Sequence, residues 1–177
     1  PASRGYDTSG NASELWEKVD LPHDYVIYET PSREENEGLG FFSYHNAWYI
    51  KKFRLSKEDK NKRITLLFEG VATHATVYLN GCLMKHNFCG YTEFEVDITD
   101  VAEFEGENTL SVYVSTEHHE GWWYEGAGIY RNVHLLISES ALSTATVKVM
   151  MGDQVHTYRV SDLEMTEEGL YQVSVRV

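Results

Sequence analysis

Apolar and polar residues alternate along several short stretches of this chain. In the stretch TEFEVDIT (residues 92–99) every second residue is apolar, and the stretch NTLSVYVST (residues 108–116) repeats the pattern. A period of two residues is typical of a β-strand with one buried face. The dipeptide Asn80-Gly81 separates two further apolar runs and supplies the two positive φ angles of a type I′ turn, which predicts a β-hairpin there.

Other runs rich in β-branched and aromatic residues are candidate strands. They lie at residues 47–55, 63–71, 129–137, 144–151, 154–160 and 170–177. No window of ten or more residues carries an apolar stripe at helical spacing. Many short strands separated by turns predict an all-β fold, either a β-sandwich or a jelly roll.

The length and a change of composition predict how the chain is divided. With 177 residues it suits one domain, or one domain plus a fragment, and is too short for a (β/α)₈ barrel of roughly 250 residues. The small polar stretch SESALST (residues 138–144) is followed by strands without aromatic loops. We therefore expect a jelly-roll domain over residues 1–140. Residues 141–177 are too few for an independent sandwich, so they are either the start of a second β domain or extra strands on the first.

The charge of the chain narrows the class of partner. The net charge of -13, from 15 basic and 28 acidic residues, argues against nucleic acid and against an anionic membrane surface. No apolar run is long enough for a transmembrane helix, and the start does not resemble a signal peptide. Because the chain begins at Pro1 rather than Met, we expect a processed or truncated piece. Periplasmic, secreted and cytoplasmic locations all stay open.

The acidic residues and histidines form no recognisable catalytic or metal-binding pattern. Most acidic residues alternate outward on predicted strands or lie in turns, which does not indicate the paired carboxylates of a glycosidase. His118, His119 and Glu120 are adjacent, and neighbours on an extended chain point to opposite faces, which disfavours a shared metal ion. No nucleophile motif is visible. We expect no catalytic residue, metal site or cofactor in this chain, and we expect Cys82 and Cys89 to be thiols rather than a disulfide.

The most distinctive segment is an aromatic stretch between two predicted strands. Trp122, Trp123 and Tyr124 are followed, after Glu125, by the sequence Gly-Ala-Gly (residues 126–128). Aromatic rings with polar edges suit stacking on the apolar face of a sugar, while neighbouring polar side chains bond its hydroxyl groups. The alternative is structural, with the tryptophans closing the end of the sandwich or contacting another domain. The composition alone does not choose between these two interpretations.

Several motifs, in their order along the chain, resemble the N-terminal domain of glycoside hydrolase family 2, which includes β-galactosidases, β-glucuronidases and β-mannosidases. The motifs are VDLPHDY (19–25), NAWYIKKFRL (46–55), LLFEGVATHATVYLNG (66–81), CGYTEFEVDIT (89–99), GENTLSVYV (106–114) and GWWYEGAGIYRNVHL (121–135). The resemblance implies a galactose-binding-like jelly roll, followed by an immunoglobulin-like domain that begins in residues 141–177. It also implies a catalytic barrel that carries both catalytic glutamates and lies outside this length.

The resemblance implies a non-catalytic fragment of a retaining exo-β-glycosidase similar to β-galactosidases, which hydrolyses O-glycosyl compounds. The fragment would supply a scaffold, contacts to the other domains of the parent chain and part of the rim of the substrate site. The implied partner is a carbohydrate such as a β-galactoside, and the parent is compatible with a homo-oligomer. Alternatives are an autonomous carbohydrate-binding module and a structural assembly domain. Candidate rim residues are the following: Asp24, His118, His119, Glu120, Trp122, Trp123 and Tyr124.

Overall fold

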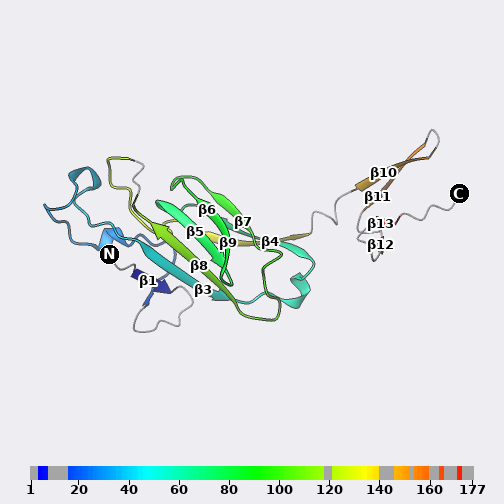
Figure 1. Cartoon of the computed structure of the whole chain (residues 1–177), viewed down its shortest axis with the longest axis horizontal. Helices are drawn as coiled ribbons and strands as arrows, with labels where there is room; N and C mark the ends of the chain where they lie inside the picture. Colours follow the sequence, from blue (N-terminus) through cyan, green and yellow to red (C-terminus); the bar gives the residue numbers. More distant parts are fainter. Residues whose placement is uncertain are drawn as a thin grey trace.

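The chain forms a two-layered β-sandwich. The computed structural model describes residues 4–7, 16–117 and 121–139, and beyond them the strands at residues 146–151, 154–159, 164–165 and 171–172. Two β-sheets pack against each other around a shared apolar core (Figure 1). The all-β sandwich that the alternating pattern predicts is therefore confirmed.

The two sheets differ in size. The larger sheet contains β1 (Arg4–Asp7), β2 (Glu17–Lys18), β3 (Ala47–Phe53), β5 (His74–Leu79), β6 (Cys82–Asn87) and β8 (Asn108–Ser115), in the order β2-β1-β3-β8-β5-β6. The smaller sheet contains β4 (Lys62–Phe68), β7 (Phe94–Asp97) and β9 (Val133–Glu139), in the order β7-β4-β9. Three short 3₁₀ helices lie in the connections: η1 (Val26–Tyr28), η2 (Glu37–Leu39) and η3 (Lys57–Asp59).

The alternation seen in the sequence holds the two sheets together. In β8 every second residue, starting with Asn108, is buried, and the residues between them are partly exposed. Its buried apolar side chains join the core together with Phe68 of β4, whose ring stacks on that of Phe94 at 4.9 Å between centroids. Each such buried side chain stabilises the fold by about 1.5–3 kcal/mol. The apolar positions of the strands therefore specify which face of each sheet is internal.

The predicted hairpin turn joins β5 to β6 and is tied to a buried amide. Asn80 and Gly81 both have positive φ, 51° and 82°, which confirms the turn. The side chain of Asn80 donates to Oδ1 of Asn108 at 3.0 Å. Asn108 is fully buried, accepts from the backbone N–H of Glu103 at 2.8 Å and donates to its carbonyl at 2.7 Å. One amide thus joins the hairpin turn to the loop that leads into β8.

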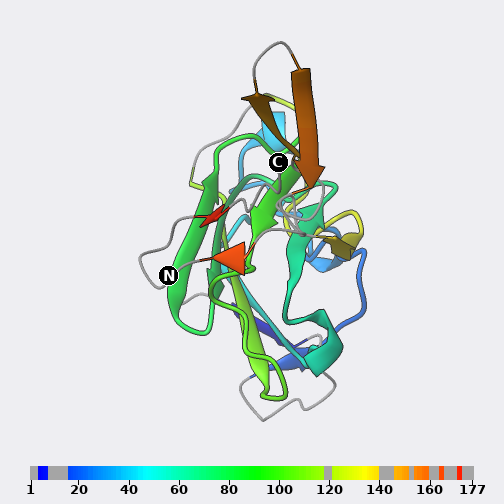
Figure 2. The same ribbon diagram turned by 90° about the vertical axis from the view of Figure 1, so that its right-hand side faces the viewer.

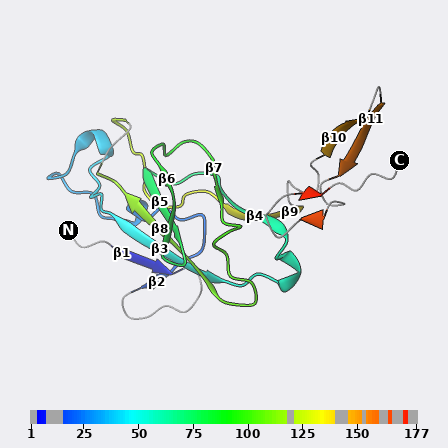
Figure 3. The same ribbon diagram turned by 45° about the vertical axis from the view of Figure 1, so that its right-hand side comes forward.

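Two features differ from the sequence prediction. The strand predicted at residues 129–137 begins only at Val133, because the carbonyl of Ile129 instead accepts from the backbone N–H of His23 at 2.8 Å. Strands β1 and β2 were not predicted, and they extend the larger sheet in parallel with β3 (Figure 3). Their few residues offer no alternation to recognise.

The strands beyond β9 form two small sheets. β10 (Thr146–Met151) and β11 (Gln154–Arg159) pair as an antiparallel hairpin, drawn in brown in Figure 2. β12 (Glu164–Met165) pairs with β13 (Tyr171–Gln172). These strands agree with the runs predicted at 144–151 and 154–160 and with part of the run at 170–177. The assignment of residues 141–177 to a second domain stays a prediction.

Two further expectations concern the cysteines and the membrane. Cys82 and Cys89 are present as separate thiols, as expected. Within the described part of the chain, every helix falls short of the length and apolarity needed to cross a membrane.

Candidate functional site at the loop end

Four connections meet at one end of the sandwich, called here the loop end. Ala47 pairs with Val114 and His74 pairs with Ser115, so the starts of β3 and β5 lie beside the end of β8. The same end of the smaller sheet holds the end of β4 and the starts of β7 and β9. Three of these connections comprise residues 40–46, 69–73 and 88–93. The fourth joins β8 to β9, and its described residues are 116–117 and 121–132. The aromatic stretch singled out in the sequence belongs to the last of them.

The carboxylate of Asp24 joins an early loop of the chain to the aromatic stretch. Its Oδ1 accepts from the backbone N–H of Val26 at 3.0 Å and of Ala127 at 3.1 Å. Its Oδ2 accepts from the hydroxyl of Tyr124 at 2.7 Å. Val26 and Ala127 are fully buried, so the carboxylate replaces the water that these N–H groups lose on folding. This geometry gives Asp24 a structural role in holding together segments about one hundred residues apart.

The two glycines at residues 126–128 let the backbone come close to this carboxylate. Gly126 has a φ of +69°, and a Cβ there would lie 2.6 Å from Oδ2 of Asp24. Gly128 has a φ of +130°, and a Cβ there would lie 2.5 Å from the carbonyl oxygen of His23. Because only glycine fits such close approaches at positive φ, these residues shape the stretch that follows the tryptophans.

Two tyrosines, one in the aromatic stretch and one in the 40–46 connection, are partly buried. The hydroxyl of Tyr44 accepts from the backbone N–H of Glu125 at 3.2 Å, and the ring of Tyr124 packs edge-on against Phe42 at 5.2 Å. Burial raises the pKa of both hydroxyls, and the hydrogen bond to Asp24 and its negative charge raise the pKa of Tyr124 further. Both hydroxyls therefore stay protonated at neutral pH and act as uncharged hydrogen-bonding groups.

Among the exposed aromatic side chains at the loop end, three belong to the aromatic stretch or bond to it. Trp122 is 86% exposed, Trp123 50% and Tyr91 48%. Nε1 of Trp123 donates to the hydroxyl of Tyr91 at 2.9 Å, so the 88–93 loop orients this indole. We call Tyr91, Trp122 and Trp123 the aromatic ledge. Exposed aromatic groups of this kind mark binding surfaces more often than lone exposed side chains do.

The structure brings some of the sequence-predicted site residues together and leaves others out. Trp122 and Trp123 belong to the exposed ledge, whereas Asp24 and Tyr124 are partly buried and bond to each other. The remaining predicted residues lie outside the described part of the chain: His118, His119 and Glu120.

Sequence reasoning missed Tyr91. This residue lies between Gly90 and the alternating stretch of β7, and the hydroxyl of Tyr130 donates to the carbonyl of Gly90 at 2.8 Å. The glycine directly before this tyrosine was the one local signal in the sequence. Its contact with Trp123 spans 32 residues, so no local pattern reveals the pair.

The nearby carboxylates are engaged in structural hydrogen bonds. Glu69 accepts from the backbone and side-chain amides of Asn132 at 3.2 and 3.1 Å, and bonds to Nε2 of His134 at 2.9 Å. The bond with His134 is the main cause that lowers the pKa of Glu69. Glu125 accepts from the backbone N–H of Gly121. Among the described residues no three His, Cys, Asp or Glu side chains converge as a metal site would require.

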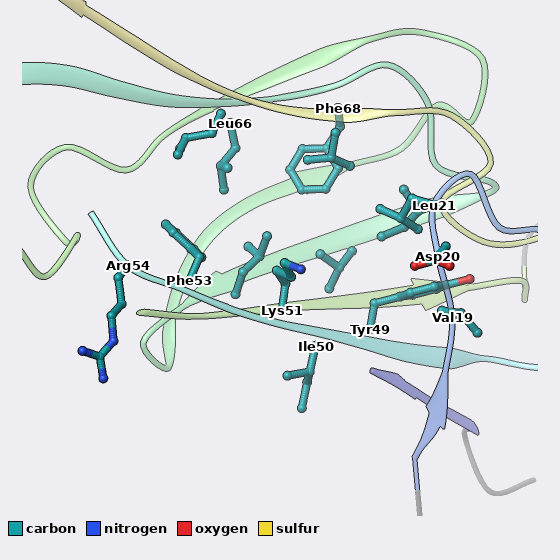
Figure 4. Close-up of a pocket in the computed structure, with 15 residues that line it drawn as sticks. Val19, Asp20, Leu21, Tyr49, Ile50, Lys51, Phe53, Arg54, Leu66 and Phe68 are labelled. Carbon is teal, nitrogen blue, oxygen red and sulfur yellow. The ribbon is translucent and has the colours of Figure 1, made fainter. Parts of the chain in front are cut away.

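A cavity of about 350 Å³ lies between the two sheets, along the edge formed by β3 and β9. Figure 4 shows Leu66 and Phe68 pointing into it from the smaller sheet, and Lys51 from β3. Its lining is mainly apolar, with Asp20 as the one carboxylate among the lining residues. A single carboxylate in an apolar lining does not provide the two carboxyl groups of a glycosidase site.

The described geometry agrees with comparisons to known proteins. A family model for the glycosyl hydrolase 2 galactose-binding domain-like family matches residues 18–136. The chain is 36% identical over 129 residues to beta-galactosidase BoGH2A of Bacteroides ovatus, covering 71% of the chain and 15% of that protein. It is 32% identical over 136 residues to a beta-glucuronidase of Formosa agariphila, covering 68% of the chain and 14% of that protein. A solved structure of a glycosyl hydrolase family 2 member from Bacteroides cellulosilyticus has a TM-score of 0.67 at 29% identity, covering 84% of the chain and 21% of that structure.

The covered fractions show which part of the relatives this chain shares. The chain spans about 15% of the length of the curated relatives it matches, and the matched part is N-terminal. The loop end and most of the sandwich lie within the matched residues 18–136, whereas β1 precedes them. The activities of those relatives belong to much longer proteins.

Proposed function

Because this chain belongs to the glycosyl hydrolase 2 galactose-binding domain-like family, we propose that it is the non-catalytic N-terminal part of a retaining exo-β-glycosidase. The greater length of the relatives supports a longer parent chain that carries the catalytic carboxylates. The structural engagement of Asp24, Glu69 and Glu125 supports the same division, since each carboxylate already accepts backbone N–H groups. The sandwich acts as a scaffold for the other domains.

The aromatic ledge is the observation that supports a direct role of this domain in binding sugar. A sugar laid against Trp123 buries its apolar C–H face on the indole, which Tyr91 holds in place. The Tyr91 hydroxyl accepts from Trp123, so its own proton is available to a sugar hydroxyl group. In the parent enzyme the ledge forms part of the rim of the substrate site.

The chemistry of the ledge favours a neutral sugar. Its three side chains, Tyr91, Trp122 and Trp123, carry no positive charge to pair with the carboxylate of a glucuronide. The curated relatives include a protein named a beta-galactosidase and a protein named a beta-glucuronidase. Of these two classes, a β-galactoside is the better match for the ledge, and we propose it as the partner.

The first test uses the chain by itself. Incubation with aryl β-galactosides and aryl β-glucuronides should release no phenol above a buffer control, because the described residues provide no acid and nucleophile pair. Turnover that a point substitution in the chain abolishes would refute the non-catalytic assignment.

The second test concerns the ledge. In a chimera, this domain replaces its counterpart in the Bacteroides ovatus β-galactosidase. The double substitution Trp122→Ala and Trp123→Ala should then lower kcat/KM for a disaccharide β-galactoside about fivefold, the equivalent of about 1 kcal/mol of stacking. The control Leu136→Ser removes a similarly exposed apolar side chain from β9 and should leave kcat/KM unchanged. Equal kcat/KM values for both variants would refute the assignment of the ledge to the rim of the substrate site and leave the domain with a scaffold role.

A further inference from the structure

A second group of aromatic side chains lies on the outer face of the larger sheet. Trp48 of β3, Tyr78 of β5 and Tyr113 of β8 occupy the partly exposed positions that alternate with buried ones. The ring of Trp48 lies 5.0 Å from that of Tyr113 and 5.8 Å from that of Tyr78, between centroids. Figure 4 shows Ile50, the next outward residue of β3, pointing away from the core.

These rings lie over the sheet rather than standing upright on it. Strands β3 and β5 are separated by β8, so their backbones are about 10 Å apart. The separation of 5.8 Å between the rings of Trp48 and Tyr78 therefore means that the two lean toward each other across β8. Ser111 of β8 pairs with Tyr78, and its small side chain leaves room for them. Both side chains are partly exposed, so the rings remain accessible to solvent.

The aromatic group continues toward both edges of the sheet. On the β6 side, His86 stacks on Phe88 at 4.2 Å with an interplanar angle of 12°, and Phe88 is 68% exposed. On the β1 side, Gly5 pairs with Trp48, and a Cβ on Gly5 would lie 2.8 Å from the ring of Trp16. Trp16 thus covers the same face as Trp48. We call Trp16, Trp48, Tyr78, Tyr113 and His86, together with Phe88 at the start of the adjoining 88–93 connection, the sheet-face platform.

Small hydroxyl side chains lie between the rings. Ser111 and Thr76 are partly exposed, and Thr76 pairs with both Tyr113 and His86. An apolar protein partner would bury these hydroxyls without hydrogen bonds, which is unfavourable. The hydroxyl groups of a sugar would satisfy them while its C–H faces stack on the rings.

The charges around the platform indicate which class of polysaccharide it fits. None of its six residues is an acid, a lysine or an arginine. The nearest outward-facing cation on β3 is Lys52, which pairs with Glu107 at 2.9 Å. Lys18 of β2, which is exposed and lies two residues after Trp16, flanks the β2 edge of the same face, whereas the rings themselves carry no charge and suit a neutral chain.

We propose that the sheet-face platform binds a neutral polysaccharide chain. The row of rings crosses several strands, so it offers successive contacts to a polymer rather than a pocket for one sugar. This site goes beyond the proposed function, because it lies on the sheet and would hold the polymer from which a terminal sugar is removed.

The test is affinity electrophoresis of the 177-residue chain in gels that contain soluble β-1,4-galactan, galactomannan, xyloglucan, mixed-linkage β-glucan or polygalacturonate. At least one neutral polysaccharide should retard the chain, and polygalacturonate should not. Tyr113→Thr and Tyr78→Thr keep residues that favour strands and should each weaken retardation at least fivefold. The double variant Trp122→Ala and Trp123→Ala, at the loop end, should migrate like the unaltered chain. Circular dichroism checks that each variant is folded.

The outcomes are distinguishable. Absence of retardation in all four gels with neutral polysaccharides would overturn polysaccharide binding by the platform. The scaffold and rim roles would not be affected. Retardation lost in the ledge variant and kept in Tyr113→Thr would assign polysaccharide binding to the loop end instead. A dimer in sedimentation velocity that Tyr113→Thr dissociates would assign this face to a second copy of the chain. As a second measurement, the emission of Trp16 and Trp48 in the ledge variant should shift on addition of the retarding polysaccharide, and an unchanged spectrum would count against the proposal.

Discussion

Replacing Asp24 with alanine tests whether the loop end is held together by one carboxylate. The substitution removes the acceptor of three hydrogen bonds and leaves the backbone N–H groups of Val26 and Ala127 buried without a partner. Each buried donor that loses its partner costs about 1–3 kcal/mol, and the hydroxyl of Tyr124 adds up to about 1 kcal/mol. We therefore expect the free energy of unfolding to fall by about 2–7 kcal/mol. This is a large fraction of the roughly 5–15 kcal/mol that stabilises a domain.

The asparagine variant separates hydrogen bonding from charge. In Asp24→Asn the amide oxygen still accepts from both backbone N–H groups, and the amide nitrogen can donate to the Tyr124 hydroxyl once that hydroxyl rotates. The expected loss is smaller, about 1–2 kcal/mol. If charge rather than the number of acceptors were decisive, the two variants would be equally unstable.

Urea unfolding followed by circular dichroism and tryptophan fluorescence measures these differences. With a slope of about 2 kcal/mol per molar urea, Asp24→Ala should lower the midpoint by about 2 M and Asp24→Asn by less than 1 M. The control Asp20→Ala changes an exposed carboxylate four residues away and should shift the midpoint by less than about 0.3 M. A midpoint shift below 0.5 M for Asp24→Ala would refute the reasoning.

Three further predictions concern pH and a buried amide. The pKa of Tyr124 is raised in the folded state, so stability should fall above pH 10, where the unfolded tyrosine ionises first, and Tyr124→Phe should reduce that slope in urea titrations. The pKa of His23 is lowered, chiefly by burial, so stability should fall as the pH drops below 6.5, and His23→Gln should flatten the curve between pH 7 and 5. Asn108→Ala leaves the N–H of Glu103 without its acceptor and should cost about 2–4 kcal/mol in the same assay, whereas an unchanged midpoint would contradict the role of this amide.

The strands of the sandwich were largely predictable because their signals are local. Alternation in β7 and β8 and the turn at Asn80-Gly81 depend on residues close together in the sequence, and the structure confirms all three. The short parallel strands β1 and β2 were not predictable, since Arg4 of β1 pairs with Ala47 of β3 far along the chain, and β2 joins the sheet only through β1.

The site was harder to read from the sequence than the fold. The tryptophans were recognisable as unusual, and their exposure agrees with a binding role. The use of Asp24 as an internal acceptor depends on Ala127, which lies 103 residues further along the chain, so a polar loop residue looked like a candidate for ligand binding. The aromatic array around Trp48 was hidden for a similar reason, because its members lie on separate strands and meet only in the sheet.

The hydrogen bond from Ala127 to Asp24 has a consequence for synthesis on the ribosome. Asp24 emerges 103 residues before its partner. At about 5–20 residues per second, it waits roughly 5–20 s, with Val26 and the early loop lacking their later neighbours. The smaller sheet is likewise incomplete until β9 has been made. The loop end therefore takes its final shape late, and nascent chains arrested before residue 127 should be cut by protease in the segment around Asp24.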